Sequence, residues 1–209
     1  MCGICGNINK NYLCEECANK IKKLEINKLD FYNEKDNFFS KHMYIFSYNG
    51  IIRKNIIDYK FNDKSYLYKT FEKIILNNKK ICDFINCYDI IIPVPIHNKR
   101  KLDRGYNQTE LILKKLIKDL NYSNNLIYGK DFLVKVKNNN RQSSLNKEDR
   151  AENVKGAYEV KKSVYKIIND KKILIFDDIY TTGNTLKQCA KIIYANDPKE
   201  IGALTIAKD

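Results

Sequence analysis

Apolar residues along this chain follow two patterns, short unbroken runs and repeats at helical spacing. Unbroken runs at 90–92 and 173–176 are typical of strands buried on both faces, as in a parallel sheet. Repeats at three and four residues predict amphipathic helices. These helices cover residues 51–59, 67–75, 111–120 and 184–194. Shorter patterns predict further strands at 44–48, 132–136 and 201–207.

The chain has 209 residues, which suits one α/β domain with a small appendage. Residues 21–40 mix lysines with leucine, isoleucine and phenylalanine, a pattern typical of an amphipathic connector. We therefore expect an appendage with its connector at 1–40, and a parallel sheet flanked by helices at 41–209.

The strand at 173–176 leads into Asp177 and Asp178 and then into a hydroxyl-rich loop. Ligands of open α/β sheets bind at the carboxyl ends of strands, and the amides at a helix start attract phosphate. Two adjacent carboxylates would repel a phosphate, so we expect them to accept hydrogen bonds from ribose hydroxyls. The expected phosphate-binding residues are Thr181, Thr182, Gly183, Asn184 and Thr185.

Residues 173–185 resemble the motif with which type I phosphoribosyltransferases bind phosphoribosyl pyrophosphate (PRPP). The resemblance implies that the two acids hold the ribose, that the loop holds its 5′-phosphate, and that Mg²⁺ accompanies PRPP. A nucleotide triphosphatase is the main alternative, because a strand ending in Asp-Asp also suits magnesium. That alternative requires a separate GxxxxGK[ST] phosphate loop, and none of the eight glycines stands in one.

Two CxxC pairs lie close to the amino terminus, Cys2 with Cys5 and Cys14 with Cys17. Each pair makes a turn that aims two thiolates at one point, as a structural zinc site requires. Disulfides and free thiols are the alternatives, but the sequence carries no export signal, which favours a reducing cytoplasm. Three further cysteines are expected to be small core residues: Cys82, Cys87 and Cys189.

A second strand end leads into a basic segment. Proline at positions 93 and 95 removes hydrogen-bond donors, so sheet pairing should stop there. Residues 97–108 then carry four cations ahead of a helix, and we expect a basic loop that binds the pyrophosphate of PRPP or is merely solvated. The candidates are Arg104 and Lys101, with Lys60 from the joint between two helices.

Several motifs together resemble the ComF family of competence-linked, amidophosphoribosyltransferase-like proteins. They are the paired CxxC motifs, Pro-Val-Pro at 93–95, Arg-Gly-Tyr-Asn-Gln at 104–108, Gln142 with Leu145, and the acids and threonines of 177–182. The family usually carries Arg-x-Thr ahead of the glutamine, where this chain has Lys137-Asn138-Asn139. The polar stretch 137–149, with Lys137 and Gln142, is our candidate for a lid over the ligand.

The net charge of +13 favours anionic partners, either a polyphosphate or nucleic acid. The family resemblance implies a role in DNA uptake. Three functions are then possible for this chain. The first is a phosphoribosyltransferase with an unknown acceptor, the second a sensor that binds PRPP or a nucleotide without turnover, and the third an accessory protein for single-stranded DNA or a competence helicase. The sequence contains no long apolar run that would span a membrane, so we expect a cytoplasmic protein.

Overall fold

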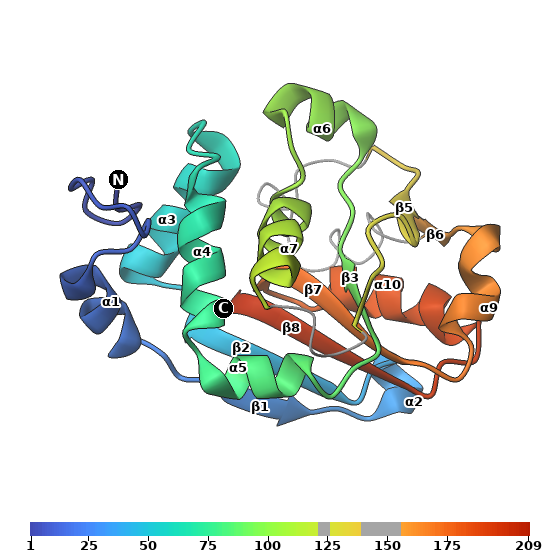
Figure 1. Cartoon of the computed structure of the whole chain (residues 1–209). Helices are drawn as coiled ribbons and strands as arrows, with labels where there is room; N and C mark the ends of the chain where they lie inside the picture. The colour runs from blue at the N-terminus through green and yellow to red at the C-terminus, as the bar shows by residue number, and fades with distance from the viewer. Residues whose placement is uncertain (121–125, 139–155) are drawn as a thin grey trace.

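The computed structural model describes residues 1–120, 126–138 and 156–209, and a mostly parallel sheet lies at its centre (Figure 1). The strand order is β1-β2-β8-β7-β3-β4, in which β1 is antiparallel to β2 and the other pairs are parallel. The strands are β1 (Lys28–Phe31), β2 (Lys41–Ser47), β3 (Ile90–Pro93), β4 (Ile127–Tyr128), β7 (Lys172–Tyr180) and β8 (Glu200–Lys208).

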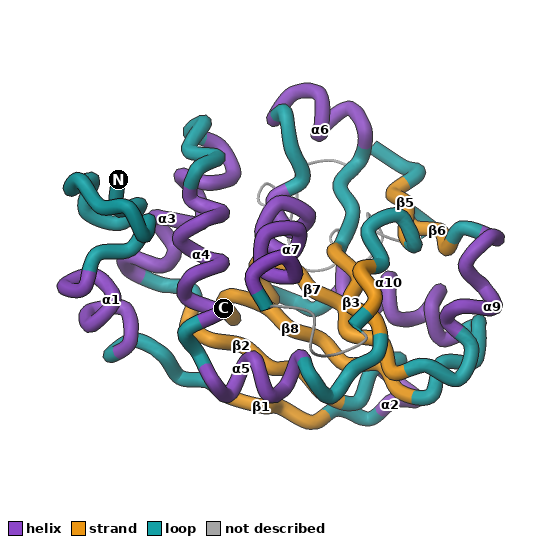
Figure 2. The backbone as a smooth tube through the Cα atoms, in the orientation of Figure 1, coloured by secondary structure: helices purple, strands orange, loops and turns teal. Residues whose placement is uncertain are grey.

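Helices cover both faces of this sheet, and a small two-stranded sheet stands beside it (Figure 2). The helices are α1 (Glu15–Lys22), α2 (Glu34–Asn37), α3 (Gly50–Phe61), α4 (Leu67–Leu76), α5 (Lys79–Ile85), α6 (Asn98–Arg104), α7 (Gln108–Asp119), α9 (Tyr165–Ile168) and α10 (Asn184–Tyr194). The small antiparallel sheet pairs β5 (Leu133–Lys135) with β6 (Tyr158–Val160).

Strand β7 is buried on both faces. Leu174 and Phe176 belong to the core formed with α3, α4, α5 and α7, whereas Ile173 and Ile175 belong to the core formed with α9 and α10. A strand in this position requires apolar side chains at every residue, which explains the unbroken run in the sequence. The α/β architecture with a parallel sheet is therefore confirmed.

The long elements agree with the sequence pattern, whereas short ones were missed. Strand β1 lies inside the expected connector and pairs with β2, α5 and β4 had no predicted counterpart, and the expected basic loop folds as α6. Strand β7 also continues through the two acids to Tyr180, because β8 pairs with it that far. The division of the chain at residue 41 stays a prediction.

The pairing of β3 with β7 ends where Pro93 lies opposite Phe176. One further hydrogen bond runs from the Val94 amide to the Phe176 carbonyl. This agrees with the expected effect of the prolines. Residues 177–180 consequently have an open edge on the β3 side. The gap at the carboxyl ends of the strands is the usual place for a ligand site in an α/β sheet.

Candidate ligand-binding cleft and cysteine cluster

A cleft of about 750 Å³ lies at these strand ends. Its walls come from the end of β7, the loop 181–185, helix α6, the end of α3 and strand β5. This volume falls in the range of small-molecule sites. Of the predicted site residues, the structure brings together Asp177, Asp178, the five loop residues, Lys60 and Arg104.

The two acids have different surroundings. Asp178 Oδ1 lies 2.7 Å from the Lys60 ammonium, and both side chains are largely buried. Asp178 Oδ2 is buried and has no hydrogen-bond partner among the described residues. Asp177 Oδ1 accepts a 2.9 Å hydrogen bond from the amide of Asp178. Burial, followed by the neighbouring charge of Asp178, raises the pKa of Asp177 to about 7.

The threonine loop turns into α10 at Gly183. This residue has φ of 74°, in the left-handed region, and a Cβ at this position would overlap the Tyr180 hydroxyl. Glycine is required on both counts. Gly183 is also the N-cap of α10, so no side chain caps the helix. No capping side chain therefore accepts hydrogen bonds from the amides in the first turn of α10. This arrangement suits the binding of an anion at the helix start.

The two predicted cations of helix α6, Arg104 and Lys101, lie in different surroundings. Arg104 lines the cleft, where Nη1 donates a 2.5 Å hydrogen bond to Gln108 Oε1 and the guanidinium lies 5.3 Å above the Phe61 ring. Burial lowers the pKa of Arg104. Lys101 instead forms a 3.2 Å ion pair with Glu110 and does not line the cleft. The structure therefore separates Lys101 from the other candidates.

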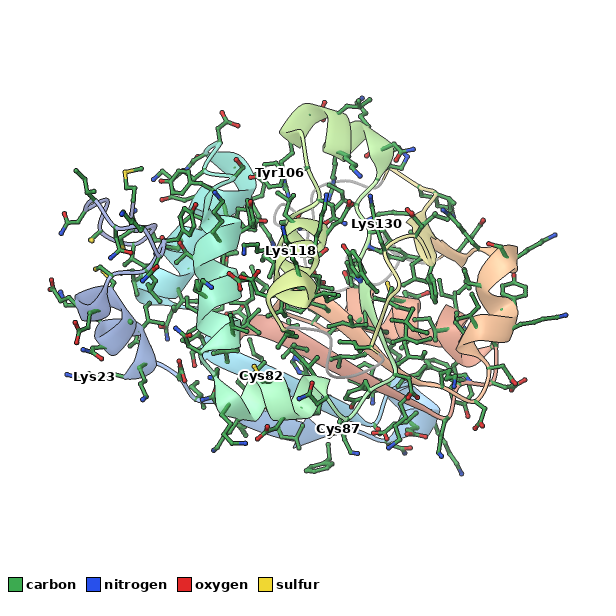
Figure 3. The ribbon with its side chains drawn as sticks, in the orientation of Figure 1. Lys23, Cys82, Cys87, Tyr106, Lys118 and Lys130 are labelled. Atoms are coloured by element: carbon green, nitrogen blue, oxygen red, sulfur yellow. The ribbon has the colours of Figure 1, made fainter. Side chains whose placement is uncertain are left out.

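The neighbours of Arg104 in the sequence hold this corner together. Gly105 ends α6 with φ of 82°. The hydroxyl of Tyr106, a residue labelled in Figure 3, donates to the Tyr59 carbonyl of α3. The Asn107 side chain accepts from the Thr109 amide to cap α7, and its Nδ2 donates to the Val94 carbonyl at 3.1 Å. Residues 105–107 thus fix the position of Arg104.

Lys135 on β5 is a cleft residue that sequence reasoning missed. Its ammonium donates a 3.2 Å hydrogen bond to the Tyr158 hydroxyl of β6. Burial, and then the charge of Arg100, lower the pKa of Lys135 to about 8. The sequence held one weak signal, a lysine inside a predicted strand. The lid candidate Lys137 lies beside Gly156 and does not line the cleft, and Gln142 lies outside the described residues.

The four amino-terminal cysteines meet at one point. The sulfurs of Cys2, Cys5, Cys14 and Cys17 all lie within 4.8 Å of one another. Four Zn–S bonds of about 2.3 Å in a tetrahedron would separate the sulfurs by about 3.8 Å, so the cluster could hold a metal. Burial opposes ionisation of Cys2, but amide hydrogen bonds from Cys14, Cys5 and Ile4 outweigh it and lower its pKa to about 6.

The segment around this cluster is seated on α4. The Thr70 hydroxyl donates a 2.9 Å hydrogen bond to the Tyr12 carbonyl, and the Lys69 ammonium lies 4.3 Å above the Tyr12 ring. A Cβ at Gly3 would overlap Thr70. The cluster therefore packs directly on helix α4.

Comparison with known proteins agrees with this geometry. The model of the phosphoribosyl transferase domain matches residues 111–209. The chain is 25% identical to Competence protein F of Haemophilus influenzae over 219 residues, which cover 97% of this chain and 93% of that protein. These similarities support the ComF family and a phosphoribosyltransferase-type fold for this chain.

Further relatives are similar to this chain over less of their length. Competence protein ComFC of Streptococcus pneumoniae is 25% identical over 80% of this chain and 68% of that protein. DNA utilization protein YhgH of Escherichia coli O157:H7 is 27% identical over 56% of this chain and 46% of that protein. Among the described residues, no helix combines the length and the apolar character that a membrane crossing requires.

Proposed function

We propose that this chain binds PRPP through residues 177–185 and serves as a phosphoribosyltransferase-like protein in DNA uptake or utilisation. One observation carries the ligand assignment. The end of strand β7 carries a buried pair of carboxylates and leads directly into the start of helix α10. Within the described parts of the chain, Asp178 Oδ2 has no hydrogen-bond donor and no side chain caps the helix. Ribose hydroxyls would supply the missing donor, and the 5′-phosphate would accept from the α10 amides.

In this proposal each residue has a different role in binding the ligand. Asp177 and Asp178 accept from the ribose hydroxyls, Lys60 keeps Asp178 oriented, and Arg104 faces the pyrophosphate. Mg²⁺ would be held mainly by oxygens of the ligand, since it gives up its water ligands reluctantly. The same arrangement suits displacement of pyrophosphate at C1, because two carboxylates near the ring favour the positive charge that develops there.

The test is thermal unfolding with and without Mg-PRPP. Ligand at one hundred times its Kd stabilises a protein by about 2.7 kcal/mol, which corresponds to about 5–11 °C for a chain of this size. We expect a shift in this range for the wild type and none for Asp177→Asn/Asp178→Asn. An unshifted wild type would remove the ligand assignment.

The role in DNA uptake rests on the ComF family and on the relatives, which are named competence and DNA utilization proteins. The net charge of +13 favours contact with single-stranded DNA, and a helicase partner stays a prediction. Fluorescence anisotropy with a labelled single strand should show binding that weakens steeply between 50 and 200 mM salt. Failure to bind at low salt would eliminate direct DNA contact.

We further propose that the metal of the cysteine cluster is a structural Zn²⁺. The all-sulfur donor set and the short distances between the four sulfurs support this choice. Metal analysis should find one zinc per chain, and Cys14→Ser should lose it. A purified wild type that is folded but free of metal would contradict the proposal.

A further inference from the structure

The turn of the loop 181–185 is not fixed by its own amides. Among the described residues, no backbone carbonyl accepts a hydrogen bond from the amide of Thr181, Thr182 or Gly183. Unpaired amides suit an anion, but they leave the turn without ties to the rest of the backbone. Gly183 adds to this freedom, because glycine has the least restricted backbone and no side chain to pack. The position of the turn therefore depends on the side chains that lie against it.

Tyr180, the last residue of β7, lies directly against this turn. A Cβ placed on Gly183 would overlap the Tyr180 hydroxyl, and the three atoms nearest to that Cβ all belong to the Tyr180 side chain. Tyr180 also lines the cleft. A displacement of the Tyr180 ring would consequently displace the Gly183 turn.

The Tyr180 ring is supported by His42. The two rings stack with 4.5 Å between their centroids and 27° between their planes. His42 on β2 is fully buried, and its Nε2 lies 2.8 Å from Thr205 Oγ1 on β8, the strand between β2 and β7 (Figure 1). Burial, followed by the charge of Lys208, lowers the pKa of His42 to about 3, so the ring is neutral at physiological pH. Stacking on a ring that is anchored in this way fixes the Tyr180 ring relative to the sheet.

Lys208 at the end of β8 makes a second contact with the Tyr180 ring. Its ammonium lies 5.2 Å from the ring centroid, within the range of a cation–π interaction. The same ammonium forms a 2.5 Å ion pair with Asp30 of β1. Residues of three other segments of the chain thus hold Tyr180 in place, and little side-chain freedom remains to be lost when a ligand binds.

We infer that Tyr180 is a positioning residue: supported by His42, it sets the position of the Gly183 turn and with it the affinity of the loop 181–185 for the 5′-phosphate. This role rests on the function proposed above, which assigns the 5′-phosphate to that loop. Tyr180 acts through the loop backbone rather than by a hydrogen bond from its hydroxyl to the ligand. The 5′-phosphate end of the ligand should therefore be sensitive to Tyr180, whereas the pyrophosphate end beside Arg104 should not.

Calorimetric titration with the two halves of the ligand tests this role. The probes are ribose 5-phosphate, and Mg-pyrophosphate added to protein that is saturated with ribose 5-phosphate. Tyr180→Leu should weaken ribose 5-phosphate at least tenfold and change the pyrophosphate affinity by less than twofold. Tyr180→Phe keeps the ring on His42 and should weaken ribose 5-phosphate by less than threefold.

Tyr88→Leu is the matched control. A Cβ on Gly202 would overlap the Tyr88 hydroxyl, as one on Gly183 would overlap that of Tyr180. Gly202, however, lies near the start of β8, whereas the cleft lies at the carboxyl ends of the strands. Tyr88→Leu should therefore lower the free energy of unfolding in urea but leave both affinities within twofold of the wild type.

Three results would overturn the inference. They are a Tyr180→Leu variant that loses both affinities equally or neither, a Tyr180→Phe variant that loses as much as Tyr180→Leu, and a loss of ribose 5-phosphate affinity in Tyr88→Leu as large as in Tyr180→Leu. The second result would assign the Tyr180 hydroxyl to direct contact with the phosphate. A wild type that binds neither ribose 5-phosphate nor PRPP would instead refute the proposed function. Urea unfolding of each variant confirms that it is folded.

Discussion

Replacing Lys60 with methionine would leave the carboxylate of Asp178 buried without its counter-ion. The Asp178 side chain is 4% exposed and that of Lys60 is 18% exposed. Removal of one partner from a buried ion pair costs about 3–5 kcal/mol, and we take about 3 kcal/mol because Lys60 reaches solvent. For a chain of this size, that loss lowers the melting temperature by about 6–12 °C.

Urea unfolding of a double-mutant cycle measures this effect. Asp178→Asn removes the charge that needed a partner, so Lys60→Met/Asp178→Asn should be about 2 kcal/mol more stable than additivity predicts. Lys54→Met is the matched control on the same helix, since the Lys54 ammonium pairs with Asp58 while its side chain is 70% exposed. That change should cost less than about 1 kcal/mol. Equal losses for Lys60→Met and Lys54→Met, or an additive cycle, would refute the reasoning.

Three further predictions concern the acids, the loop and the cysteine cluster. Because the pKa of Asp177 is raised to about 7, the folded chain keeps a proton that the unfolded chain releases near pH 4. The unfolding free energy of the wild type relative to Asp177→Asn should therefore fall between about pH 4 and 7 and level off above, and urea unfolding across this range measures it. Gly183→Ala should weaken PRPP at least tenfold by calorimetry, because its Cβ would displace Tyr180 and strain the backbone; unchanged affinity would contradict this. Chelation of the metal should expose residues 1–17 to protease before the rest of the chain, and simultaneous cleavage throughout would argue against a structural role.

Sequence reasoning succeeded where the signal is local. The run 173–176 predicted a doubly buried strand, because only apolar side chains suit both faces of a central strand. Gly183 and its threonines predicted the turn into α10. Helix α6 was missed because it is a short basic helix with no buried residue, and Leu102 on it is 84% exposed. Such a helix has no apolar face for a periodic pattern to reveal.

The missed parts of the site depend on contacts between distant segments. The ion pair between Lys60 and Asp178 was not predicted, because it forms only where the fold brings α3 to β7. The assignment of Lys60 to the pyrophosphate side stays a prediction. Lys135 enters the cleft only because β5 and β6 pair beside α10. Neither contact has a signature in the local pattern, since each requires the positions of two elements that are remote in sequence.

Calorimetric titration of the purified chain with Mg-PRPP tests the central claim most directly. We predict saturable binding of one PRPP per chain to the wild type and no measurable binding to a folded Asp177→Asn/Asp178→Asn variant. Equal affinity of the two proteins would contradict the assignment of these acids to the ribose, and absence of heat with the wild type would contradict PRPP binding itself.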